Sequence, residues 1–104
     1  MISQYTKSVL KTSMNNVLSS AGIKASFGVY HDTLVLKIKK ANSKIDFIDN
    51  YNSNVCGYQK ESVIMTDEYF NAYRFSGEAK KVVDSLFSIA KSHGCKLAID
   101  VSDF

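Results

Sequence analysis

The sequence contains no proline, only two cysteines and a single arginine, and each scarcity narrows what the protein is. With no proline, repeat or low-complexity tract to mark a linker, residues 1–104 are expected to form one domain. Cys56 and Cys95 lack CxxC spacing. We therefore expect neither a disulfide framework nor a cysteine metal site, and predict that both residues are free, partly buried thiols.

Long hydrophobic runs are also missing. The longest apolar runs are only a few residues, which excludes a transmembrane span and predicts no membrane partner. The first seven residues lack the apolar segment of a signal peptide, so a cytoplasmic protein is expected. With 45% hydrophobic and 22% charged residues, the composition is typical of a globular chain that builds one core without metals or disulfides.

Familiar catalytic motifs are absent as well. The chain has no HExxH, Walker, GxSxG or dinucleotide-binding glycine pattern. His31 and His93 are expected at a hairpin turn and at a helix end, where each is a surface residue. We therefore predict no catalytic residue, no metal and no cofactor, and a protein that is not an enzyme.

Charge is unevenly distributed, although the formal net charge is only +3. Residues 1–44 carry seven lysines against one aspartate, a net charge of +6. Residues 45–78 carry two basic and six acidic side chains, a net charge of −4. One side of such a protein could attract an anionic partner, although a mixed solvated surface explains the same composition.

Two long helices are predicted by apolar residues that recur every three or four positions. The first covers Gln4–Ser20, with Ser3 as its N-cap and Gly22 where a left-handed C-terminal cap is wanted. The second opens at Ser76. Alternating hydrophobicity predicts four strands, and the first two form a hairpin around His31-Asp32. The predicted strands cover residues 24–30, 33–39, 58–66 and 95–101.

The segment between the hairpin and the third strand is ambiguous. Ile45, Ile48 and Tyr51 recur every three residues, which favours a short helix capped by Ser43, although a strand is the alternative. Residues 50–57 are expected to be a loop. The predicted fold is α+β, in the order α-β-β-α-β-α-β, with a mainly antiparallel sheet of about four strands and two main helices packed on one face. Six residues are expected to share the core: Leu10, Met14, Leu36, Ile38, Leu86 and Ile99.

Four aromatic residues crowd the stretch "TDEYFNAYRFSG", which fits neither a clean strand nor a clean helix. Phe70 and Phe75 are expected to anchor it to the core. Tyr69, Tyr73 and Arg74 would then form a partner-binding surface, because tyrosine and arginine are enriched in interface hot spots. A cover over the sheet edge is the alternative role for the two tyrosines.

A second candidate surface consists of Lys37, Lys39, Lys40 and Lys44. Period-two alternation places Lys37 and Lys39 on the sheet face away from the core, where they could follow a phosphate backbone. Two observations limit this interpretation. Arg74 is the only arginine available for reading bases, and lysines on strands also protect sheet edges from aggregation.

Three segments resemble small domains of phages and mobile elements, namely one of the families called large polyvalent protein-associated domains. They are "VLKTSMNNVLSSAGIKASFGVYHDTLVLKI", "IDFIDNYN" and "VIMTDEYFNAYRFSGEAKKVVDSLFSIA", which together span about residues 7–90. The resemblance covers an opening helix, a β-hairpin and a strand that leads through an aromatic Phe-Ser-Gly turn into a helix. One departure is Ala41-Asn42-Ser43, where the family leads us to expect Gly-Pro.

The resemblance implies a phage or mobile-element origin, and small proteins of that origin often disable host defences. The leading hypothesis is a non-enzymatic protein that binds a host protein or ribonucleoprotein complex in the cytoplasm of the host cell and inhibits defence, as anti-CRISPR proteins do. The alternative is a nucleic-acid-binding accessory protein that uses the lysines of the hairpin. The sequence leaves the oligomeric state open.

Overall fold

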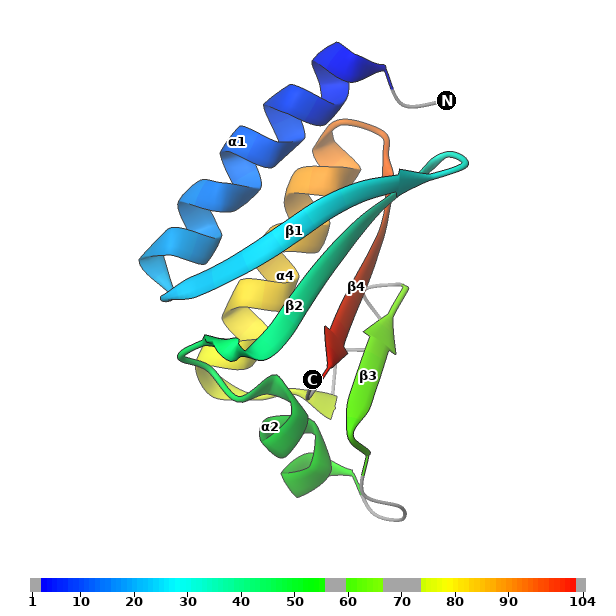
Figure 1. Ribbon diagram of the computed structural model, residues 1–104. Helices are drawn as coiled ribbons and strands as arrows, with labels where there is room; N and C mark the ends of the chain where they lie inside the picture. The colour runs from blue at the N-terminus through cyan, green and yellow to red at the C-terminus, as the bar shows by residue number, and fades with distance from the viewer. Residues whose placement is uncertain (1–2, 56–59, 67–73, 103–104) are drawn as a thin grey trace.

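The computed structural model describes residues 3–55, 60–66 and 74–102, which form a four-stranded sheet with two long helices on one face (Figure 1). The expected α+β class and element order are confirmed. The elements are α1 (Gln4–Ser20), β1 (Ile23–Tyr30), β2 (Thr33–Ser43), α2 (Phe47–Asn54), β3 (Ser62–Met65), α4 (Gly77–Ser92) and β4 (Lys96–Ser102).

The two long helices have the ends that their sequences predict. Ser3 caps α1 by accepting a hydrogen bond at its Oγ from the amide of Thr6, at 3.1 Å. After the helix, Gly22 adopts a φ of +73°, the left-handed conformation in which glycine avoids a Cβ clash. Ser76 stands at the N-cap position of α4, but its side chain makes no capping hydrogen bond there. Its Oγ instead accepts a hydrogen bond from Nδ2 of Asn54 at 3.1 Å. Local signals therefore set both ends of α1.

The sheet has the order β1-β2-β4-β3. Both outer pairs are antiparallel, but the central pair, β2 and β4, is parallel. The sheet is thus mixed, and the expectation of a mainly antiparallel sheet is wrong. Hairpin geometry fixes only β1 against β2, whereas α2, β3 and α4 separate β2 from β4 and provide the crossover that parallel strands require.

The chain between β2 and α2 differs from its prediction. The short helix is confirmed, but its cap is Asp46, whose Oδ1 accepts the amide of Asp49 at 2.9 Å. Ser43 instead ends β2, and its Oγ accepts the amide of Ile45 at 3.2 Å. Both residue types are good caps, so spacing alone could not choose between them.

Two further boundaries also shift. Residues 50–54 belong to α2 rather than to a loop. The third strand, expected over residues 58–66, covers only Ser62–Met65; residues 58 and 59 lie outside the described part of the chain. Its short length leaves Lys96, Leu97 and Ala98 of β4 beyond the register of β3.

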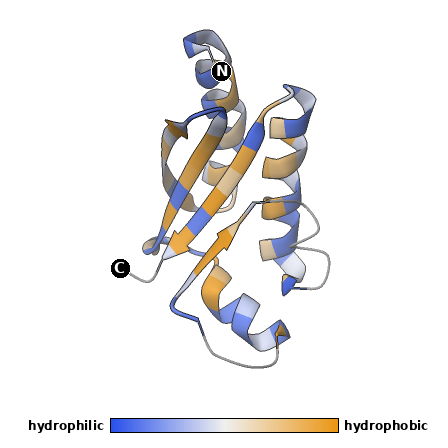
Figure 2. Cartoon of the chain, turned by 90° about the vertical axis from the view of Figure 1, so that its right-hand side faces the viewer, coloured by the Kyte–Doolittle hydropathy of each residue, from blue (hydrophilic) through white to orange (hydrophobic). Residues whose placement is uncertain are grey.

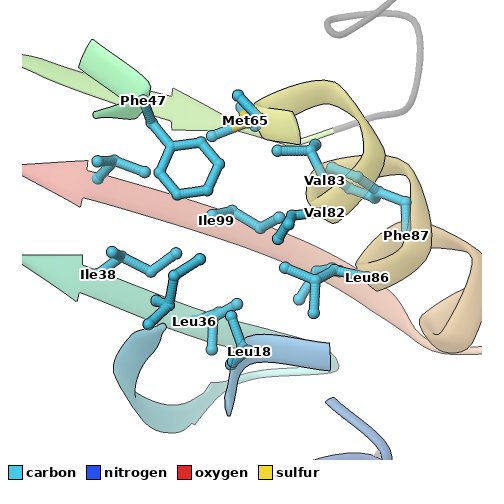
Figure 3. Close-up of a cluster of buried hydrophobic side chains, with 14 of the residues drawn as sticks. Leu18, Leu36, Ile38, Phe47, Met65, Val82, Val83, Leu86, Phe87 and Ile99 are labelled. Carbon is cyan, nitrogen blue, oxygen red and sulfur yellow. The ribbon is translucent and has the colours of Figure 1, made fainter. Parts of the chain in front are cut away.

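The core fills the space between the sheet and the two helices. Figure 3 shows Leu36, Ile38 and Ile99 of the sheet pointing toward Val82 and Leu86 of α4. At one end, Phe47 of α2 lies beside Met65 of β3 (Figure 3). All six predicted core residues are buried, each at most 1% exposed.

The opposite face of the sheet is covered by no helix in the described part of the chain (Figure 1). Hydrophobic and hydrophilic residues alternate along the strands in the side view of Figure 2, as expected for a sheet buried on one face. We call this uncovered surface the open face. No helix within residues 3–55, 60–66 and 74–102 is long and apolar enough to cross a membrane.

Candidate nucleic-acid interface

The open face is built from the residues that alternate with the core positions of each strand. On β1, Phe27 pairs with Leu36 toward the helices, so the neighbouring pair Ser26 and Lys37 points outward. The register continues into β4, where Lys37 is the partner of Asp100. The open face therefore has a basic residue at the centre of the sheet, on a strand paired on both sides.

Lys37 and Lys39 are exposed on this face, where the sequence predicts them. A hollow in the open face is lined by both residues and also by Lys24, Ser26 and Asn42. Among the described residues, no acidic side chain lines this hollow, so its three ammonium groups attract anions. The serine and asparagine side chains supply neutral hydrogen-bonding groups.

Lys44 lies in a neighbouring hollow at the turn between α1 and β1, which Lys24 and Asn42 also line. The amide of Lys44 donates to the carbonyl of Gly22 at 3.1 Å. Its aliphatic stem crosses the space over Gly22, where a Cβ would lie 2.8 Å from Cγ of Lys44. The two hollows share residues, so Lys24, Lys37, Lys39 and Lys44 form one continuous basic surface, the lysine strip.

Lys40 is the one predicted lysine that lies apart from the strip. Its Nζ is 3.6 Å from Oδ2 of Asp46, the carboxylate that caps α2. Lys40 lines neither of the two hollows. This ion pair offsets its charge locally, so the structure removes Lys40 from the candidate surface.

Lys24 is the residue that sequence reasoning missed. The hairpin pairs Tyr30 with Thr33 across a two-residue turn, and the same register continued along the strands brings Lys24 level with Lys39. The observed register shifts between Ile23 and Ala25, yet Lys24 stays exposed on the open face. The hairpin register therefore contains the signal that groups Lys24 with Lys39, whereas the alternation within either strand alone does not.

One acidic residue also lies on the open face, and another lies at the hairpin end of the sheet. Asp100 is partly buried opposite Lys37 and places a carboxylate beside the strip. At the hairpin end, Lys96 Nζ lies 3.5 Å from Asp32 Oδ2. The Lys96 charge is the main cause that lowers the pKa of Asp32 below its usual value.

Of the predicted aromatic surface, Tyr69 and Tyr73, together with Phe70, lie outside the described residues. Arg74 is partly buried. Phe75 is 2% exposed, which confirms its predicted role as an anchor. Its ring packs against Phe47 and Tyr51, with centroid distances of 6.3 and 5.9 Å.

The thiol prediction is confirmed for one of the two cysteines. Cys95 is free and partly buried, as predicted, whereas Cys56 lies outside the described residues. Within the described ranges, no group of three or more histidine, cysteine, aspartate or glutamate side chains is placed to hold a metal ion.

The chain was compared with family models, with curated proteins and with solved structures, and none of the three comparisons finds a match.

Proposed function

We propose that this protein binds nucleic acid without catalysis, through the lysine strip on the open face of its sheet. The observation that supports this proposal is that two adjoining hollows are lined by the four lysines of the strip, namely Lys24, Lys37, Lys39 and Lys44. Lysines on a sheet neutralise phosphates and release counterions, which drives association. Nothing in the described helices lies over the strip, so a partner reaches it without displacing an element of the fold.

The test measures nucleic-acid binding as a function of salt. Fluorescence anisotropy with a labelled DNA strand at low ionic strength should detect binding that weakens steeply as salt is added. In the Lys37→Gln/Lys39→Gln variant the slope of log K against log salt should become less negative by about 1.4, since each phosphate contact on a single strand contributes about −0.7.

A matched control is available on α4. The Lys80→Gln/Lys81→Gln variant lowers the formal net charge from +3 to the same +1, but both lysines lie on a helix that covers the other face. This control should keep nearly all of the affinity. Equal losses in the two variants would mean that net charge alone, rather than the strip, causes binding, and absence of binding at low salt would reject the proposal.

A second candidate is inhibition of a host defence complex, which the sequence resemblance implies. One structural observation favours it. The chain beside Arg74 is fixed to α2, because Phe75 is buried and Asn50 Oδ1 accepts the amide of Ser76 at 3.0 Å. A binding group held in this way loses less conformational freedom on association.

The two candidates are separated by affinity capture from a host lysate, with and without nuclease. A partner that survives nuclease and is lost in Arg74→Ala supports the defence-complex candidate. Weaker binding in Tyr69→Ala or Tyr73→Ala would show that these tyrosines belong to the same binding surface. A hot-spot residue there should cost at least about 2 kcal/mol of binding free energy. Release of the partner by nuclease supports the nucleic-acid proposal instead.

A further inference from the structure

We propose that the nucleic acid bound on the open face is single-stranded, and that one unpaired base lies flat on the sheet next to the lysine strip. This inference rests on the proposed nucleic-acid binding and adds the class of nucleic acid and a second contact. The base-binding residues are Gly28, Val35 and Ala98, which we call the floor, and Tyr30, which borders them.

The floor lies across three strands in register. Gly28 of β1 pairs with Val35 of β2, which in turn pairs with Ala98 of β4. All three are partly buried residues on the open face, although no described helix covers them. Adjacent strands are about 4.8 Å apart, so the floor spans about 10 Å, which is wide enough for one base.

The surface above the floor is unobstructed at its β1 end. A Cβ built on Gly28 would meet no atom within 4 Å, so open space lies over this residue. Glycine normally weakens a strand, because it offers no side chain to pack. A flat site that needs close approach of a ligand to the backbone explains why a residue without a side chain is suited to this position.

Tyr30 and the lysine strip border opposite sides of the floor. Tyr30 follows Gly28 by two residues on the same face, a rise of about 6.7 Å. Tyr30 is 70% exposed, and its ring centroid lies 4.4 Å from that of His31 in an edge-to-face contact. On the other side, Lys37 follows Val35 by two residues on the same face. An exposed aromatic ring, a flat apolar floor and an ammonium group thus lie in sequence.

This order of groups fits a nucleotide whose base is exposed. A base can stack on the floor or on Tyr30 while its phosphate contacts Lys37, a combination found in proteins that hold single strands. In a duplex, the base faces are already stacked on one another, so no base face is free to lie on the floor or on Tyr30. The geometry therefore favours a single strand over a duplex.

The first experiment compares a mixed-sequence DNA strand of about 15 nucleotides, within the usual size of such sites, with its duplex and with the RNA strand of the same sequence. Single strands should bind at least about fivefold more tightly than the duplex. The Tyr30→Ala variant should weaken single-strand binding by at least about fivefold, the lower limit for loss of one stacked base, and leave duplex binding unchanged. Tyr5→Ala is the control, since Tyr5 is 79% exposed but lies on α1.

The second experiment fills the floor. Gly28→Val places a branched side chain in the open space, which should block a flat base while the strand itself tolerates valine. Ser62→Val, an exposed position near the far end of the open face on β3, is the control. We expect at least about fivefold weaker single-strand binding in Gly28→Val only, with both variants retaining the parent melting temperature.

The outcomes separate this inference from the proposed function. Equal affinity for strand and duplex, with Tyr30→Ala and Gly28→Val both neutral but Lys37→Gln/Lys39→Gln weakened, would overturn the base site and leave nucleic-acid binding intact. Absence of binding to every strand and duplex would overturn both. A lysate partner that resists nuclease and is lost in the lysine variant would assign the open face to a protein and overturn the inference.

Discussion

Replacing Gly22 by alanine tests how the turn between α1 and β1 supports the lysine strip. Gly22 has a φ of +73°, where an L-residue with a Cβ costs roughly 1–2 kcal/mol. The added Cβ would also lie 2.8 Å from Cγ and 3.2 Å from Cβ of Lys44, so the lysine stem must move. Forcing a side chain off its preferred rotamer costs about 0.5–1.5 kcal/mol. The total expected loss of unfolding free energy is therefore about 1.5–3.5 kcal/mol.

Gly94 is the matched control for the backbone contribution. It also follows a helix and has a φ of +67°, but a Cβ built there meets no atom within 4 Å. Gly94→Ala should thus show the backbone cost alone, about 1–2 kcal/mol. The difference between the two variants isolates the contact of position 22 with Lys44.

The measurement is urea denaturation of both variants and of the parent, followed by circular dichroism, together with salt-dependent binding. Gly22→Ala should be less stable than Gly94→Ala and should bind nucleic acid more weakly, because displacement of the Lys44 stem moves one ammonium group from the strip. Equal stability of the two variants would show that the stem does not fill the space over Gly22. Unchanged binding would remove Lys44 from the site.

The remaining predictions concern the core, the open face and the hairpin end. Leu36→Ala should lower the unfolding free energy by about 2–5 kcal/mol, because Leu36 is fully buried; a loss below about 1 kcal/mol in chemical denaturation would contradict the core assignment. Asp100→Asn should tighten nucleic-acid binding by a factor of roughly 2–5, since unit charges a few ångströms apart interact by about 1 kcal/mol even in water. Weaker binding of this variant in fluorescence anisotropy would show that the carboxylate does not repel the ligand. Lys96→Ala should raise the pKa of Asp32 toward its ordinary value in an NMR titration, and no change would refute the ion pair as the cause. Because the pKa of Asp32 is lowered in the folded state, the pair stabilises the protein above about pH 4 and loses this contribution as the pH falls through the lowered pKa.

Local signals account for the parts of the fold that were predicted correctly. The ends of α1 follow from the sequence, because the cap at Ser3 needs a hydrogen bond to a nearby amide and the turn at Gly22 needs a positive φ. The direction of β4 does not follow from local signals, because it depends on how α4 returns the chain to the sheet. The choice of Asp46 over Ser43 as the cap of α2 depends on where β2 stops pairing, which is also a tertiary property.

The candidate site was predicted in part for the same reason. Alternation along one strand correctly exposes Lys37 and Lys39. Lys24 joins them only through cross-strand pairing, and Lys40 leaves them only through its contact with Asp46. Spacing along a single strand encodes neither the cross-strand pairing of Lys24 nor the contact of Lys40 with Asp46. The sequence could therefore show that single lysines are exposed, but not which of them share a surface.

The parallel pairing at the centre of the sheet has a consequence for how the protein is made. β4 is the last described strand in the sequence, yet it lies between β2 and β3. During synthesis, β1 and β2 can form their hairpin early, but β2 and β3 keep unpaired edges until residues 96–102 have left the ribosome. Unpaired edges are templates for aggregation. A ribosome that stalls before β4 would therefore release a chain with two exposed strands, one of which is the strand that carries Lys37 and Lys39.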